Sequence, residues 1–193
     1  LQAAVFQRLP GKLFTIDKVT KSSAIFDYDK LNWLNQHYIK NKDLSDIADM
    51  ILPYLTDLNI KVSDRKYLEN ILSLGIDRDY NLKNIASGLT YYFENDLNYK
   101  SDDFVKLDPI KSKAVIENVI KKISNIDFDN KENISNCIKE VCSDMSLKFK
   151  DVGPAVRFAL TARLKAPSID ELCFTLGKDK ALKRLNDFYA FLS

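Results

Sequence analysis

Apolar residues recur every three or four positions along most of this chain, which is the spacing that gives a helix one buried face. Between residues 43 and 145 the pattern predicts five amphipathic helices separated by short polar turns. The positions that define their buried faces include Ile47, Ile51, Leu55, Leu68, Ile71, Ile85, Leu89, Ile116, Val119, Ile134 and Val141. No segment after residue 26 alternates apolar and polar residues as a strand would, so the body of the chain is predicted to be all-α.

Residues that cap helices support the same segmentation. Asp27 and Asp64 stand directly before periodic segments, where a carboxylate accepts hydrogen bonds from the free N–H groups of a first helical turn. Asp108 is followed by Pro109, and proline is favoured at the first helical position. Gly75 is predicted to end the helix that Asp64 begins.

The helix after Asp27 carries two large aromatic residues, Trp33 and Tyr38. Burial in the core is the favoured interpretation, because such side chains contribute most of their area to packing. Contact with a ribose–phosphate backbone is the alternative.

The stretch from residue 152 to residue 185 is predicted to form three helices in close succession. The first breaks at Pro167, and Ser168 with Glu171 three positions later matches a capping box. Gly177 is predicted to end the second helix, because glycine enters the left-handed cap conformation without steric cost. The third helix is expected to turn four residues inward: Leu182, Leu185, Tyr189 and Leu192.

The same stretch concentrates positive charge. From Lys148 to Arg184 there are nine Lys or Arg against four Asp or Glu, whereas the whole chain has a net charge of only +2. A nucleic-acid surface would therefore have to come from segregated charge. Arg157, Arg163 and Lys165 lie near the predicted break, where arginine planes can stack on bases. A solvated, lysine-rich helix face is the other interpretation.

Composition describes an ordinary folded protein, with 46% hydrophobic and 29% charged residues. The three cysteines Cys137, Cys142 and Cys173 form no C-x-x-C pair, and we interpret them as reduced residues of a cytoplasmic protein. No apolar run is long enough to span a bilayer, so no membrane association is expected.

The side-chain sets that usually carry catalysis are missing from this sequence. The single histidine, His37, leaves no imidazole for a triad, and neither a phosphate-binding glycine loop nor an HEXXH metal motif is present. Asp77 and Asp79 flank Arg78 on a polar turn and are interpreted as solvated loop charges. The chain is therefore predicted to hold no metal and not to be an enzyme by itself.

Two blocks of the sequence resemble one known family. Residues 152–185, VGPAVRFALTARLKAPSIDELCFTLGKDKALKRL, are similar to the C-terminal signature of bacterial-type glutamyl-tRNA synthetases. That signature has a PLR-like step, an ALTG-like middle, a Ser-Pro or Thr-Pro turn and an LGKE-type ending, and Ala162 stands where ALTG has glycine. Residues 21–39 resemble the segment that follows the catalytic domain in the same family, through KSSAIFD, KLNWLN and Tyr38-Ile39.

The resemblance implies a division of labour within a longer protein. ATP-dependent activation of glutamate, with its ATP and Mg²⁺, would take place in a catalytic domain upstream, and the present chain would be inactive alone. A stem-contact segment would cover residues 1–42, followed by two α-helical anticodon-binding subdomains over residues 43–105 and 106–193. The implied partner is tRNA(Glu), bound by a monomer in the cytoplasm.

The resemblance also implies which residues read the anticodon. The arginine that reads the third base corresponds to Arg78, and its presence goes with selection of glutamate tRNA over glutamine tRNA. The arginine of the PLR-like step corresponds to Arg157. The apolar residues that pack on the first two bases correspond to Pro167 and Ile169, while Ala166 replaces a Ser or Thr hydroxyl.

For the N-terminal segment the resemblance implies contacts with the tRNA stem by Lys21, Lys30 and Asn35.

Without the two matching blocks, the helices and their mixed charge would favour a different function, a helical module that binds a partner protein.

Overall fold

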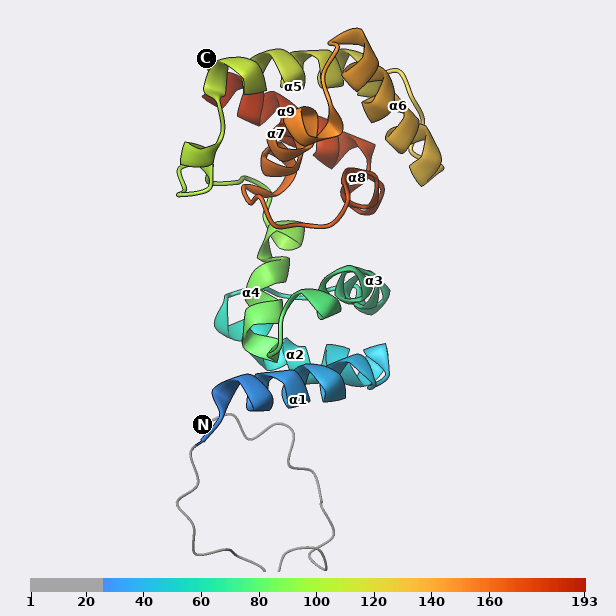
Figure 1. Cartoon of the computed structure of the whole chain (residues 1–193). Helices are drawn as coiled ribbons and strands as arrows, with labels where there is room; N and C mark the ends of the chain where they lie inside the picture. Colours follow the sequence, from blue (N-terminus) through green and yellow to red (C-terminus); the bar gives the residue numbers. More distant parts are fainter. Residues whose placement is uncertain (1–25) are drawn as a thin grey trace, which may run out of the picture.

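The computed structural model describes residues 26–193, and within that range it is helical without any strand. The predicted all-α fold is therefore confirmed. The first lobe contains α1 (Tyr28–Lys40), α2 (Leu44–Asp57), α3 (Arg65–Gly75), the 3₁₀ turn η2 (Ile76–Arg78) and α4 (Leu82–Phe93). The second contains the 3₁₀ turn η3 (Phe104–Lys106), α5 (Pro109–Ile123), α6 (Lys131–Asp144), α7 (Phe149–Thr161), α8 (Ile169–Leu176) and α9 (Lys178–Phe191). Figure 1 shows the two lobes stacked end to end, with a waist beyond the end of α4.

The first lobe is built on the apolar faces of α2, α3 and α4, and its helices begin where the capping residues predict. Asp27 accepts a hydrogen bond from the Lys30 N–H at 2.9 Å, and Asp64 accepts one from the Tyr67 N–H at 3.0 Å. The predicted face residues of α2, α3 and α4 are buried: Ile47, Ile51, Leu55, Leu68, Ile71, Ile85 and Leu89.

Gly75 ends α3, but not through a left-handed cap. Its φ is −114°, and the chain continues into η2. A Cβ atom on Gly75 would lie 3.1 Å from Cδ2 of Leu89, which is closer than ordinary van der Waals contact. Glycine at this position therefore serves the close approach of α3 to α4.

The prediction that Trp33 and Tyr38 belong to the core is wrong. Trp33 is 64% exposed and Tyr38 is 50% exposed, and Ile39 is the one buried residue of α1. The rest of the attachment is polar, since Lys40 pairs with Asp77 at 3.0 Å. Because α1 meets the lobe along so narrow a stripe, most of its apolar residues face outward.

The second lobe follows the sequence pattern in α5, α6 and α7. Asp108 accepts a hydrogen bond from the Lys111 N–H at 3.0 Å, with Pro109 at the start of α5 as predicted. Gly177 ends α8 as predicted, but its φ of 78° and ψ of 160° are not those of the predicted left-handed cap; glycine is still favoured there because φ is positive. Ser168 and Glu171 do not form a capping box, because the Ser168 hydroxyl bonds the Glu171 carboxylate itself, at 3.0 Å.

The buried face of α9 differs from the predicted one. Leu185 is buried as expected, but Leu182, Tyr189 and Leu192 are only partly buried at the edge of the core. The fully buried set is Ala181, Arg184, Leu185 and Phe188. A positive charge thus occupies a position that a hydrophobic pattern cannot predict.

The Arg184 guanidinium lies where the two lobes join. It donates to the carbonyl of Leu160 at 2.5 Å, near the end of α7, and to the carbonyl of Glu94 at 2.8 Å, just past the end of α4. It also donates to the carbonyl of Tyr91. The C-terminal end of a helix carries partial negative charge, so two helix ends together compensate a cation that has no exposed surface.

Tyr99 completes this junction from the segment between α4 and η3. Its hydroxyl oxygen is 2.9 Å from the Ala159 carbonyl oxygen and 3.0 Å from that of Arg184, and its ring packs on Phe188 with centroids 5.0 Å apart. Tyr99 therefore packs with the second lobe, although it precedes the predicted boundary at residue 105. The boundaries at residues 42 and 105 remain predictions.

Replacing Arg184 by methionine should lower the free energy of unfolding by about 3 kcal/mol, because three backbone carbonyls lose their donor inside the protein. Urea denaturation followed by circular dichroism measures the change. Lys150→Met, at an exposed position of α7, is the control and should leave the midpoint unchanged. An equally unchanged midpoint for Arg184→Met would contradict the role given to this side chain.

Ala162, directly after α7, adopts a left-handed conformation with φ 53° and ψ 25°. Because the Cβ atom is strained there, Ala162→Gly should raise the free energy of unfolding by about 0.5–1 kcal/mol. The same substitution at Ala114, on the exposed side of α5, should lower it by about 1 kcal/mol. Thermal unfolding of both variants decides the matter, and a loss of stability at both positions would refute the strain.

Candidate nucleic-acid interface

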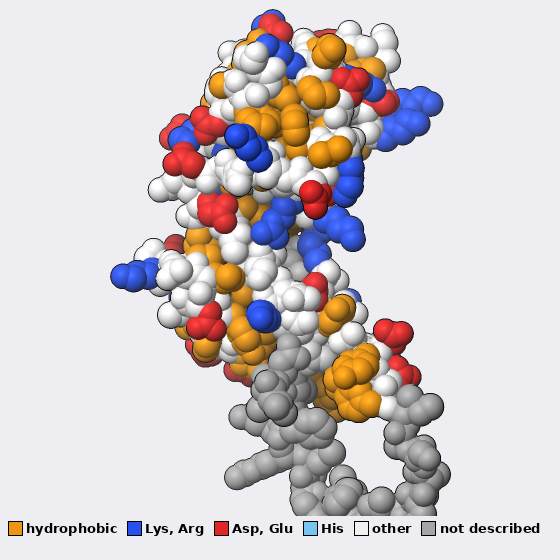
Figure 2. All heavy atoms as spheres, turned by 90° about the vertical axis from the view of Figure 1, so that its left-hand side faces the viewer, with side chains coloured by type: hydrophobic (Ala, Val, Ile, Leu, Met, Phe, Trp, Pro, Cys, Tyr) orange, Lys and Arg blue, Asp and Glu red, His pale blue; other side chains and the backbone are white. Residues whose placement is uncertain are grey.

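A cavity of about 490 Å³ opens at the waist, between α4 and the loop that follows α7. Its lining includes Arg78, Gly88, Arg163, Lys165 and Pro167. Figure 2 shows Lys and Arg side chains gathered at the waist between the two lobes. Both lobes therefore contribute to one positively charged hollow.

Arg78 enters the cavity from the first lobe, at the end of η2. Its Nε atom donates to the carbonyl of Leu74 at 3.1 Å, which anchors the guanidinium at the end of α3. The side chain is otherwise exposed. An arginine held by one nitrogen keeps its two terminal nitrogens for a ligand.

Arg163 enters from the second lobe, in the loop between α7 and α8. Its Nη2 atom donates to the hydroxyl of Thr90 at 3.2 Å, and its guanidinium carbon lies 5.9 Å from the centre of the Tyr91 ring. The Thr161 hydroxyl is 2.8 Å from the Arg157 carbonyl oxygen and accepts from the Arg163 N–H at 3.2 Å. These bonds tie the start of the loop to the last turn of α7.

Arg157 supports the same loop from inside α7. Its Nε atom donates to the carbonyl of Pro167 at 3.2 Å. Partial burial lowers the pKa of the Arg157 guanidinium, and the positive charge of Arg78 lowers it further. The two arginines are therefore close enough for their charges to repel each other.

The positive charges around the cavity lack acidic partners. Within residues 26–193, no carboxylate oxygen lies within 4.0 Å of a nitrogen of Arg78, Arg157 or Arg163. The one acidic side chain of the lining, Asp79, accepts from the N–H of Tyr80 and the amide of Asn84. A cluster of unpaired guanidinium groups is a binding site for an anion.

The predicted readers of the first two bases differ in their positions. Pro167 is largely buried but borders the cavity. Ile169 is only 2% exposed and belongs to the core, so in this conformation its side chain does not reach a base. The reason is that α8 turns Ile169 together with Leu172 and Cys173 towards α6 and α7.

Comparisons with known proteins identify the family of this chain. A family model described as an anticodon binding domain matches residues 46–189 of the chain. The chain belongs to this anticodon-binding family. It is 29% identical to a glutamate–tRNA ligase of Geobacter sulfurreducens and 32% identical to one of Geotalea uraniireducens, covering 93% of this chain and 38% of the relative in both cases.

A solved structure has the same fold over most of this anticodon-binding chain. The glutamate tRNA ligase from Elizabethkingia meningosepticum superposes with a TM-score of 0.78 and is 24% identical, over 93% of this chain and 36% of that one. The present chain thus spans less than two fifths of the length of the proteins it matches, and what it covers is their anticodon-binding part rather than their catalytic part.

The predicted stem contacts of this anticodon-binding chain lie on α1 and before it. Lys30 is exposed. The Asn35 amide donates to the carbonyl of Tyr80 at 2.5 Å, so its donor group already joins α1 to the turn behind Arg78. Lys21 lies outside the described residues.

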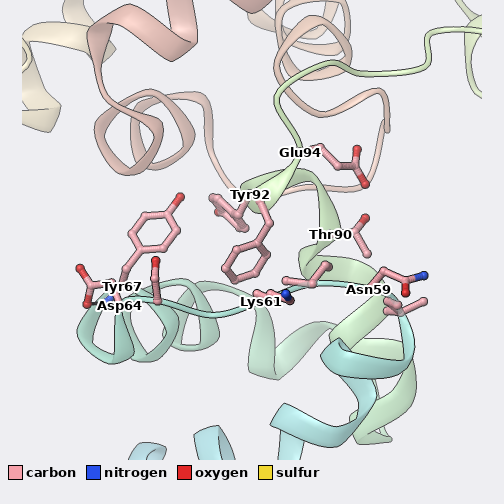
Figure 3. Close-up of a pocket in the computed structure, with 11 residues that line it drawn as sticks. Asn59, Lys61, Asp64, Tyr67, Thr90, Tyr92 and Glu94 are labelled. Carbon is pink, nitrogen blue, oxygen red and sulfur yellow. Dashed lines mark hydrogen bonds between the residues drawn. The ribbon is translucent and has the colours of Figure 1, made fainter.

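A second cavity, of about 690 Å³, lies between α3 and the end of α4. Figure 3 shows Asp64 and Tyr67 on one side and Thr90, Tyr92 and Glu94 on the other, with Lys61 nearby. Its lining contains two carboxylates and one lysine but no arginine, so it is unsuited to a polyanion.

Over residues 26–193, no three His, Cys, Asp or Glu side chains group together as a metal site would require. None of the helices in this range is both long and apolar enough to cross a membrane.

The sequence pattern places Arg163 among the basic residues that can stack on bases, but it does not indicate a role for Gly88. A glycine in the middle of an amphipathic helix, six residues after the helix starts, was the available signal for Gly88.

Proposed function

We propose that this chain is the tRNA-binding, anticodon-reading part of a glutamate–tRNA ligase. It would hold tRNA(Glu) so that the acceptor end reaches a catalytic domain elsewhere in the protein, where ATP and Mg²⁺ act. The observation that carries the proposal is the cluster of arginines without carboxylate partners at the waist, in a chain whose family is defined by anticodon binding.

The anticodon is a short single-stranded loop whose bases can be unstacked and read on their Watson–Crick edges. An arginine fork pairs with two acceptors at once, such as the carbonyl oxygen and ring nitrogen of a cytosine. Arg78, anchored only through Nε, is the group we assign to the third anticodon base. Arg157 holds the Pro167 carbonyl and thereby places the loop edge against the neighbouring bases.

The same arrangement explains how a chain with a net charge of only +2 can bind RNA. Phosphate contacts release counterions, so a few clustered cations give appreciable and salt-dependent affinity. We propose that the chain acts as a monomer in the cytoplasm, and that Lys30 contacts the tRNA stem. Asn35 stays a predicted stem contact, because its amide has two N–H donors and only one is bonded to the Tyr80 carbonyl.

Removing single arginines should weaken tRNA binding in different ways. Arg78→Ala should reduce affinity for tRNA(Glu) by about 10-fold, as one lost bidentate contact does. This reduction in affinity should be smaller for a tRNA whose third anticodon base is changed, because that tRNA has already lost the contact with Arg78. Arg157→Ala should weaken binding whatever the third base is, because it releases the Pro167 loop. Fluorescence anisotropy with labelled tRNA, at 50 and 200 mM salt, measures both effects.

Lys139→Ala is the control, because it removes one positive charge from the exposed side of α6, away from the waist (Figure 1). It should bind tRNA as the unchanged chain does. If Arg78→Ala lowers affinity equally for tRNAs with every third anticodon base, the role assigned to Arg78 is wrong. Absence of tRNA binding by the unchanged chain at low salt would overturn the proposed function and favour the protein-binding module.

A further inference from the structure

Gly88 stands in the interior of α4, where glycine is less favourable than alanine. The other described glycines have reasons within the fold. A Cβ atom on Gly75 would lie 3.1 Å from Leu89, one on Gly153 would lie 3.0 Å from the Phe149 ring, and Gly177 has a positive φ. At Gly88 φ is not positive, and a Cβ atom would meet nothing within 4 Å.

The space in front of Gly88 is the cavity at the waist, which Gly88 lines together with Arg78 and Arg163. A volume of about 490 Å³ falls in the range of ligand cavities, roughly 300–1,000 Å³. Bare backbone on one wall lets a flat or bulky group approach more closely than any side chain would allow. No side chain or backbone within the fold occupies the space next to Gly88, so this wall of the cavity is open to a ligand.

The chemistry of the remaining walls indicates what that ligand is. Arg163 is held by Thr90 and lies over Tyr91, so its guanidinium plane is fixed before any ligand arrives. Asn84 and Ser87 add uncharged polar groups, and Pro167 adds an apolar edge. Cations for a phosphate, polar groups such as the Ser87 hydroxyl for a base edge and a bare wall for a ring meet the requirements of a single unstacked nucleotide.

We infer that the waist cavity is a nucleotide subsite in which one unstacked nucleotide of the bound RNA lies against the backbone of α4 at Gly88, with Arg163 as its second cationic contact beside Arg78. This inference rests on the proposed function and extends it. It makes Gly88 and Arg163 binding residues, and it explains why the helix interior has a glycine that neither packing nor backbone conformation requires.

Filling the cavity should therefore block RNA without harming the fold. Gly88→Leu should lower affinity for tRNA(Glu) at least 10-fold while the melting temperature stays equal or rises, because leucine favours a helix and the space is open. Gly88→Ala should raise the melting temperature with a smaller loss of affinity. Ala114→Leu, which adds the same side chain on the exposed side of α5, should bind tRNA normally.

A second arm identifies the nucleotide. Each anticodon-loop nucleotide of tRNA(Glu) is replaced in turn by an abasic residue, and affinities are measured for the unchanged chain, Gly88→Leu and Arg163→Met. One abasic position should weaken binding to the unchanged chain but should cost Gly88→Leu and Arg163→Met nothing further, because the subsite is already lost in these variants.

The outcomes separate the two proposals. If the unchanged chain binds tRNA and the Gly88 and Arg163 variants bind it equally well, the subsite is wrong while the anticodon-reading function stands. If every abasic position costs the variants as much as the unchanged chain, the subsite is wrong as well. If the unchanged chain does not bind tRNA at low salt, both proposals fall together.

Discussion

The whole arrangement depends on one buried guanidinium. Arg184 bonds carbonyl oxygens at the ends of α4 and α7, and these two helices belong to different lobes. A cation without solvent exposure is costly unless the protein supplies compensating charge, and two converging helix ends supply it. Lys180 adds a bond to the Tyr92 carbonyl at 2.9 Å, also at the end of α4. The relative position of the lobes is thus set by cations of α9.

The waist cavity exists only because the lobes are held in this way. Arg78 comes from the first lobe and Arg163 from the second, and the two residues are 85 positions apart in the chain. The basic residues of the C-terminal stretch consequently serve two purposes. Lys180 and Arg184 bond backbone carbonyls inside the molecule, whereas Arg163 lines the hollow with Arg78 and Arg157 holds the Pro167 carbonyl at its edge. A count of positive charges along the chain does not distinguish these uses.

Some residues around the cavity hold its shape, and others are left to bind a ligand. Thr161, Arg157 and the left-handed Ala162 shape the loop after α7, and Gly75 lets α3 approach α4 so that η2 presents Arg78. Arg78, Arg163 and Pro167 border the cavity, and each is hydrogen-bonded to a residue of α3, α4 or α7. A preorganised site of this kind loses little conformational freedom when it binds its ligand.

The order and limits of the helices follow from local physics that the sequence displays. Apolar periodicity predicts α2 to α7, and Asp27, Asp64, Asp108 and Gly177 act where capping rules place them. The family resemblance likewise assigns Arg78, Arg157 and Pro167 to one task, reading the anticodon. Only the tertiary structure decides that Arg184 is buried, that Trp33 is exposed, that Ile169 lies in the core and that Gly88 faces an open cavity. Each of these depends on which face of a helix meets another element, and hydrophobic spacing alone does not determine that. For Arg184 the deciding factor is the set of backbone carbonyls at the ends of distant helices, which compensate its charge.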